Sequence, residues 1–237
     1  MKTKTLYILI CILLFVAFVL IMLSAFSNIA QQTSESVAEY KPTVIIDAGH
    51  GGEDGGAVVG DTVEKDLNLS IALKLSDILK LNGFNVKNIR ETDVSIYTDN
   101  AQSLSQKKKS DLNERLKTFN NDDNNIVISI HQNKFEQSKY FGTQIFYSKN
   151  NKNSAALAES IRKSVVMLLQ PDNTRECKQA RKNIFLLYNA TVPAVIVECG
   201  FMSNENELNK LKDENYQNQM AFAIYLGFLE YYNDLEG

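Results

Sequence analysis

The chain has 237 residues, 25 basic and 28 acidic side chains, and a formal net charge of −3. This acidic balance argues against a nucleic-acid-binding surface, although it leaves carbohydrate and peptide substrates open. The three cysteines form no C-x-x-C spacing, which excludes a thiolate zinc knuckle and a dithiol redox motif.

The first predicted element is an apolar segment from Leu6 to Phe26, with Lys2 and Lys4 before it. About 20 apolar residues are enough to span a bilayer, and the lysines favour a cytoplasmic N-terminus. The residues after the segment offer only poor cleavage sites. We therefore expect an uncleaved transmembrane anchor, with a cleaved signal segment as the alternative. In both cases the remainder is expected to be exported across the cytoplasmic membrane.

The predicted organisation has three parts: an anchor or signal segment at residues 1–30, a polar linker at 31–41, and one domain at 42–237. The last part is long enough to bury a good core. Its two cysteines, Cys177 and Cys199, are expected to be small free or buried thiols rather than a disulfide.

Within the domain, apolar strands alternate with amphipathic helices. The predicted strands are Val44–Asp47, Phe84–Ile89, Asn125–Ile130, Phe141–Ser148, Ile184–Tyr188 and Pro193–Glu198. The predicted helices are Glu64–Leu81, Asp111–Asn120, Asn153–Leu169 and two within Asn204–Tyr232. The stretches Gly49–Gly60 and Arg90–Ser110 are expected to be irregular. This order predicts an α/β domain of three layers, in which a mostly parallel central sheet is flanked by helices.

Three of the predicted strands end in side chains that can carry chemistry. His50 follows the first strand, His131 follows the third, and Glu198 closes the last. In open α/β sheets the ligand crevice lies beyond the carboxyl ends of the strands. We therefore expect these three side chains to meet at one edge of the sheet. The alternative is that each histidine is a hydrogen-bonded structural residue with no role in chemistry.

Two histidines and one carboxylate are a common ligand set for catalytic zinc, which keeps a further position for water. Glu64 is the favoured third ligand because it begins the first helix, and Glu53 and Asp54 compete with it. A carboxylate that does not bind the metal would be the general base. Glu198 fits this role because it closes an apolar strand, where burial raises the pKa of a carboxyl group.

Four blocks of sequence carry a resemblance. They are Asp47–Gly52, Glu64–Asn68, Ser129–Asn133 and Val197–Asn204. In this order they resemble the signature blocks of the zinc-dependent N-acetylmuramoyl-L-alanine amidases, the amidase-3 family. The resemblance runs from about Val44 to Tyr232, and the stretches Arg90–Asp93 and Leu112–Arg115 also resemble family positions. Ala48 stands where the family usually has proline, and Gln132 where cysteine or alanine is frequent, but neither departure removes a ligand.

The resemblance implies that His50, Glu64 and His131 bind one zinc ion and that Glu198 is the catalytic carboxylate. It also implies the reaction, which is hydrolysis of the amide between the lactyl group of N-acetylmuramic acid and L-alanine in peptidoglycan. Zinc would polarise the carbonyl and lower the pKa of a water molecule. Glu198 would take the proton of that water and deliver one to the leaving amine.

An apolar segment followed by a bare catalytic domain is similar to the sporulation amidases, which act on spore cortex. Those enzymes prepare muramic acid for conversion to muramic δ-lactam, which germination enzymes recognise. The resemblance also implies an activating partner protein, which is a lipoprotein in the clostridial members of this branch. The segment Asp99–Lys109 looks longer than expected, and we interpret it as a loop insertion rather than a partner surface.

Two other functions remain open at this point. One is a zinc peptidase that cuts within the stem peptide with the same ligands. The other is a wall-binding or partner-binding protein in which the metal site is present but weak, so that its affinity depends on a partner.

Overall fold

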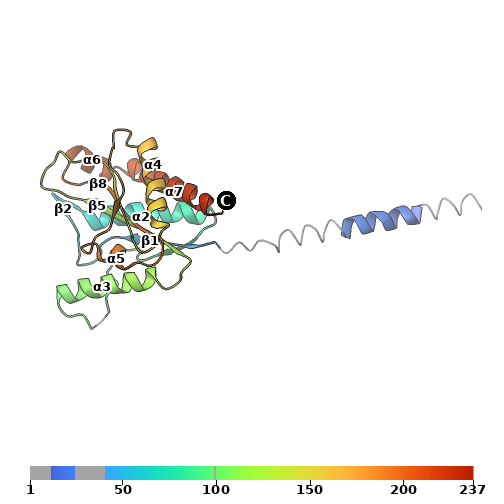
Figure 1. The fold of residues 1–237 in the computed structure, drawn as a ribbon, viewed down its shortest axis with the longest axis horizontal. Helices are drawn as coiled ribbons and strands as arrows, with labels where there is room; N and C mark the ends of the chain where they lie inside the picture. Colours follow the sequence, from blue (N-terminus) through green and yellow to red (C-terminus); the bar gives the residue numbers. More distant parts are fainter. Residues whose placement is uncertain (1–11, 25–40, 99, 237) are drawn as a thin grey trace, which may run out of the picture. The chain divides into compact units, whose positions relative to one another are not determined.

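In the computed structural model, residues 12–24, 41–98 and 100–236 are described (Figure 1). Residues 12–24 are helical and belong to the predicted segment Leu6 to Phe26, the rest of which lies outside the described residues. Residues 31–40 of the predicted linker also lie outside them. None of the helices in the described ranges has both the length and the apolar character needed to cross a membrane.

The described part of residues 42–237 is built around a six-stranded sheet with the order β4-β1-β5-β8-β6-β7. The strands are β1 (Thr43–Ala48), β4 (Asn85–Asn88), β5 (Asn125–Asn133), β6 (Gln144–Tyr147), β7 (Lys178–Gln179) and β8 (Ala194–Phe201). All neighbours are parallel except β6 and β8, which confirms the predicted mostly parallel sheet. Because β6 runs antiparallel, it begins at the edge where β8 ends.

Helices cover both faces of this sheet (Figure 1). One face packs against α2 (Glu64–Leu81), α4 (Ser154–Leu168) and α7 (Glu214–Glu236), and the other against α3 (Leu104–Phe119) and α5 (Phe185–Asn189). The short helix α6 (Glu205–Lys212) follows β8. The two apolar cores are formed by alternate residues of the strands, so that Ile46 and Ile128 face α2 while Ile45 and Val127 face α3. Each aliphatic side chain buried in this way contributes about 1.5–3 kcal/mol.

The same alternation of side chains along the strands places His131 and Glu198 on one face of the sheet. His131 follows the parity of Val127 in β5, and Glu198 follows the parity of Ile196 in β8. Both therefore lie on the face that α3 and α5 cover. Cys199 points to the opposite core, where it is fully buried. The register pairs His131 with Glu198 on adjacent strands, so that the two side chains leave the sheet side by side.

Two predictions of secondary structure were wrong. The stretch Ile184–Tyr188 is not a strand, because Phe185–Asn189 forms the short helix α5. A short apolar run fits a buried strand and a buried helical turn equally well, and here consecutive leucines pack against the sheet as a helix. Residues 104–109 are not a loop, because α3 begins at Leu104 rather than at Asp111. Ser103 and Gln106 form a capping box that starts this helix.

The glycine-rich stretch also contains more structure than the predicted irregular loop. A short hairpin of two antiparallel strands, β2 (Val58–Val59) and β3 (Thr62–Val63), leads into α2. This hairpin turns the chain so that the first residue of α2, Glu64, returns to the end of β1. The backbone N–H of Glu64 donates to the carbonyl of Ala57 at 2.9 Å.

Candidate metal centre

Three side chains with metal-binding atoms meet at the carboxyl edge of the sheet. His50 follows β1, His131 lies near the end of β5, and Glu64 reaches them from the first turn of α2. Oε1 of Glu64 lies 3.4 Å from Nε2 of His50 and 3.1 Å from Nδ1 of His131. One ligand atom from each residue lies within 4.8 Å of the others. The donor set, with two imidazole nitrogens and one carboxylate oxygen, fits a single zinc ion and leaves room for water.

Glycines make this close approach possible. A Cβ atom on Gly49 would lie 2.2 Å from Nε2 of His131, so only glycine lets the end of β1 pass this ring. A Cβ atom on Gly56 would lie 2.5 Å from Oε2 of Glu64. Any side chain at either position would push a candidate ligand away from the centre.

His50 itself has an unusual backbone conformation. Its φ is 62°, in the left-handed region that residues other than glycine seldom adopt. Such a conformation costs on the order of 1–3 kcal/mol and persists only when the surroundings hold it. Two arginines do so here. Arg115 donates to the carbonyl of His50 at 2.7 Å, and Arg90 donates to the carbonyl of Gly49 at 3.1 Å. Both also donate to the carbonyl of Ala48.

The Arg115 guanidinium is itself buried, with an exposed fraction of 2%. It forms an ion pair with Asp47, which is fully buried and also accepts a hydrogen bond from Ser129 at 2.6 Å. Burial opposes ionisation of Asp47, but the charge of Arg115 and the Ser129 hydroxyl outweigh it and lower its pKa. The loop that carries His50 is therefore held in place by Arg115, whose buried charge is paired with that of Asp47.

A further carboxylate, Asp54, contacts the His50 ring on the side away from the candidate metal centre. Its Oδ2 lies 3.0 Å from Nδ1 of His50, which leaves Nε2 to face the centre. A carboxylate that orients the far nitrogen of a ligating histidine is common around protein-bound zinc. Glu53, the other competitor for the third ligand position, instead pairs with Lys107 at the surface. The structure thus brings Glu64, and neither of its competitors, to both histidines.

Glu64 is held in its ionised form. Its Oε2 accepts from the backbone N–H of Ala57 at 2.8 Å, and its Oε1 accepts from that of Gln132 at 3.1 Å. Burial raises the pKa of a carboxyl group, but the hydrogen bonds and charges of His131 and His50 reverse this effect and lower the pKa of Glu64. An ionised carboxylate beside two imidazoles is the state that binds a cation.

Glu198 lies next to this cluster and differs from Glu64. Its Oε2 is buried and has no hydrogen-bond partner among the described residues. Burial raises the pKa of Glu198 to about 7, against the opposing charge of His131. A carboxyl group with this pKa exchanges protons readily near neutral pH, as a general base and acid must. The predicted convergence of His50, His131 and Glu198 is therefore present in the fold.

The thiols do not take part. The two cysteines in the described ranges, Cys177 and Cys199, are both free, as expected. Burial raises the pKa of Cys199 far above its usual value, so this thiol stays protonated and is not a nucleophile.

The affinity for zinc is expected to depend on pH through His50. Burial lowers the pKa of this imidazole, but the hydrogen bonds with Asp54 and Glu64 outweigh it and raise the pKa to about 9. Because a metal binds only the neutral ring, zinc must displace one proton below that pH. We expect the apparent zinc affinity to rise by up to about tenfold per pH unit between pH 7 and 9.

Chelator-competition titrations at several pH values would measure this slope. The same His50 proton stabilises the metal-free fold below the unfolded pKa of 6.5, and this stabilisation is lost as the pH rises towards 9. Asp54→Asn removes the principal partner of His50, so its affinity curve should level off at lower pH. Identical curves for this variant and the unmodified chain would contradict the account.

A His–Glu–His cluster beside a buried, readily protonated carboxylate, at the carboxyl edge of a parallel sheet, is typical of a metal-dependent hydrolase. Comparison with known proteins identifies the family within this class. The chain belongs to the N-acetylmuramoyl-L-alanine amidase family, whose sequence model matches residues 44–230. It is accordingly an enzyme that hydrolyses the amide between N-acetylmuramic acid and L-alanine in peptidoglycan.

Individual relatives agree with this assignment. A germination-specific N-acetylmuramoyl-L-alanine amidase of Bacillus subtilis is 34% identical over 195 residues, which cover 81% of this chain and 80% of the relative. The CwlD amidase of Clostridioides difficile, solved in complex with the GerS lipoprotein, is 41% identical with a TM-score of 0.78. That match covers 82% of this chain and 100% of the solved one. An N-acetylmuramoyl-L-alanine amidase of Clostridium difficile 630 is 30% identical, with a TM-score of 0.71. This match covers 83% of the present chain and 99% of the solved one.

Proposed function

We propose that this amidase holds one zinc ion with His50, Glu64 and His131 and uses Glu198 as its general base and acid. The observation that carries this proposal is the approach of the three ligand atoms to within 4.8 Å of one another. Bound zinc would polarise the scissile carbonyl and acidify a water molecule. The carboxylate of Glu198 would take a proton from water, and the same carboxyl group would then protonate the amine of L-alanine as it leaves.

We also propose that the natural substrate is spore-cortex peptidoglycan, and that cleavage exposes the lactyl carboxyl groups that are then converted to muramic δ-lactam. The name of the Bacillus subtilis relative, a germination-specific amidase, supports this assignment. So does the similarity to the CwlD amidase. Since that amidase was solved with a lipoprotein, we propose that a lipoprotein partner also binds this chain.

The proposed location is outside the cytoplasmic membrane, where peptidoglycan lies. In this proposal residues 1–30 are an anchor or signal segment, 31–41 a linker, and 42–237 the catalytic domain. The apolar composition of Leu6 to Phe26 supports this division.

Digestion of purified peptidoglycan tests the reaction. Mass spectrometry of the soluble products should find stem peptides that begin with a free L-alanine amine, and glycan strands with free lactyl groups. Fragments cut within the stem would instead identify a zinc peptidase, and retention on the wall without any release would identify a binding protein. Muropeptides of spores that lack the chain test the physiological role, because normal δ-lactam content would exclude it and leave the chemistry standing.

A further inference from the structure

A cleft of about 170 Å³ lies beside the candidate metal centre, on the face of the sheet that α3 and α5 cover. His50 and His131 form part of its wall. The cleft therefore borders the candidate metal centre, where the proposed function places the scissile amide. Its other walls differ in chemistry, since one is apolar and the other carries a lysine.

The apolar wall comes from α5 and the strand beneath it. Phe185 and Leu186 line the cleft together with Ile184 and Ile196. Phe185 is 37% exposed, which is high for a phenylalanine at the edge of a core. This wall suits a small aliphatic group such as the methyl group of alanine.

The polar wall comes from α3 and the glycine loop. Lys108 lines the cleft, and its side chain is 56% exposed. Its Nζ lies 3.2 Å from Oδ2 of Asp54. Among the described residues, Asp54 is the one acidic residue that forms an ion pair with Lys108. An ammonium group has three N–H donors, so this pair leaves donors available to a ligand.

The other charged groups of the cleft are already paired. Asp54 is occupied by His50 and Lys108, and Asp111 by Arg115. Arg115 is buried and directs its donors to Asp111, Asp47 and the carbonyl of His50. Among the described residues that line the cleft, Lys108 is therefore the cation that can bind a carboxylate from solution.

We propose that this cleft binds the stem peptide and that Lys108 binds the free main-chain carboxylate of its second residue. This inference rests on the proposed function, because it assumes that the peptide leaves the metal centre on the α3 and α5 side. The first stem residue, L-alanine, places its methyl group against Phe185 and Leu186. The second is a glutamate joined through its side chain, so that its main-chain carboxyl group carries a charge unless it is amidated.

Lys108 would then set a preference between two forms of peptidoglycan. A stem with a free carboxylate gains a charge-assisted hydrogen bond, and an amidated stem does not. Because Lys108 is exposed, solvent screens the interaction, so we expect a preference of about two- to fivefold in kcat/KM rather than an absolute one. Loss of Lys108 would also leave Asp54 facing the substrate carboxylate, which lowers the preference further.

The test is an internal competition with the full-length protein. Peptidoglycan in which about half of the second stem residues are amidated is digested to low conversion, and both released stem peptides are quantified by mass spectrometry. The ratio of the two products gives the ratio of the two kcat/KM values, and it does not depend on enzyme concentration or metal loading. We expect about a two- to fivefold excess of the unamidated product, which should fall to near parity in Lys108→Met.

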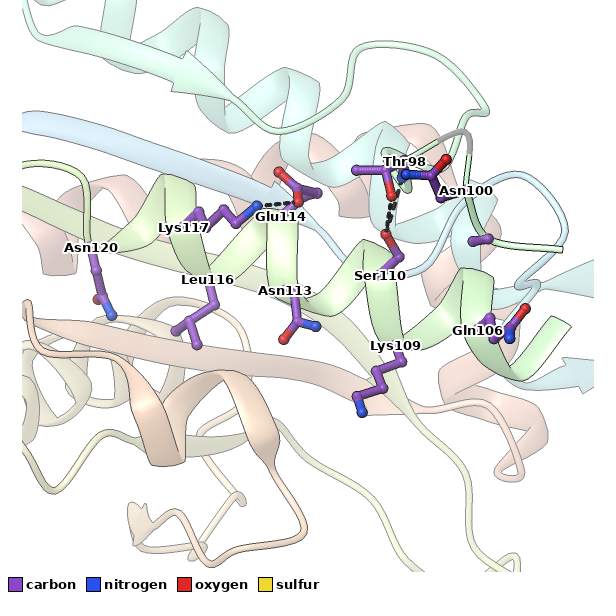
Figure 2. Close-up of a pocket in the computed structure, with 11 residues that line it drawn as sticks. Thr98, Asn100, Gln106, Lys109, Ser110, Asn113, Glu114, Leu116, Lys117 and Asn120 are labelled. Carbon is purple, nitrogen blue, oxygen red and sulfur yellow. Dashed lines mark hydrogen bonds and ion pairs between the residues drawn. The ribbon is translucent and has the colours of Figure 1, made fainter. Parts of the chain in front are cut away.

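Lys109→Met is the matched control. Figure 2 shows Lys109 among the side chains that line a separate groove along α3, and Lys108 does not belong to that groove. This neighbouring variant should keep the ratio of the unmodified chain, while Lys108→Glu should favour the amidated stem. A ratio that Lys108→Met leaves unchanged would overturn the assignment of Lys108. Absence of any released stem peptide would instead reject the amidase function itself.

Discussion

Replacing Glu198 by glutamine is expected to lower kcat by about 10³-fold and to leave zinc binding nearly unchanged. The amide keeps the size of the carboxyl group but cannot accept the proton of water. Since the proposed ligands are His50, Glu64 and His131, removal of the negative charge at Glu198 should change the zinc affinity by only a few-fold. Metal content and the rate of stem-peptide release, measured on the same preparation, would test both parts.

Glu207→Gln is a matched control for this variant. Burial also raises the pKa of Glu207, but its carboxylate accepts backbone hydrogen bonds from Phe201 and Gly142. A glutamine keeps one of these two bonds, because only its carbonyl oxygen can accept, so we expect some loss of stability. Because Glu207 does not belong to the candidate metal cluster, kcat should still stay within a few-fold. Loss of zinc from the Glu198 variant would show that Glu198 is a ligand, and retention of full activity would place the general base elsewhere.

His131→Ala should remove both the metal and the activity. Substitution of a residue that merely supports a ligand weakens metal binding by about 10–100-fold, so the loss of a ligand should exceed 100-fold. The remaining pair, His50 and Glu64, would leave two positions of the metal open to solvent. The affinity can be measured with a competing chelator, and circular dichroism would confirm that the fold survives.

Thermal unfolding gives an independent measurement of the same effect. A metal ion that binds only the native state raises the melting temperature of the protein. We expect this shift in the unmodified chain, a smaller shift in Asp54→Asn, and none in His131→Ala at moderate zinc concentration. A His131→Ala protein with the zinc-dependent shift of the unmodified chain would remove His131 from the ligand set.

The main features of the fold follow from local patterns in the sequence. β1, β5 and β8 are continuous apolar runs, and strands of this kind are typical of parallel sheets with both faces covered. Their polar ends, His50, His131 and Glu198, could be assigned to one edge for that reason. The position of Glu64 at the start of the first predicted helix favoured it over Glu53 and Asp54, although these two acids are closer to His50 in the chain. The family resemblance settled the choice, and the path of the β2–β3 hairpin explains how Glu64 reaches the histidines.

Other parts of the site depend on tertiary contacts that no local pattern encodes. Arg115 appears in the sequence as one charged residue on an amphipathic helix, and its burial against Asp47 becomes visible only in the assembled fold. Arg90 belonged to a stretch expected to be irregular. The early start of α3 had a local signal, the capping box of Ser103 and Gln106, but the lysines that follow it have no apolar periodicity. α5 is too short for its period to separate helix from strand.

The order in which the ligands occur along the chain has a consequence for folding. The first unit of the sheet, β1–α2–β4, contains His50 and Glu64 but neither His131 nor Glu198. The missing groups arrive only when β5 and β8 pair with residues far away in sequence, and such long-range pairing is slow. A partly folded chain thus has two of the three proposed ligands and lacks Glu198, the proposed proton acceptor. The proposed metal centre is therefore completed only after the central sheet has formed, so a partly folded chain should bind zinc weakly and should not hydrolyse peptidoglycan.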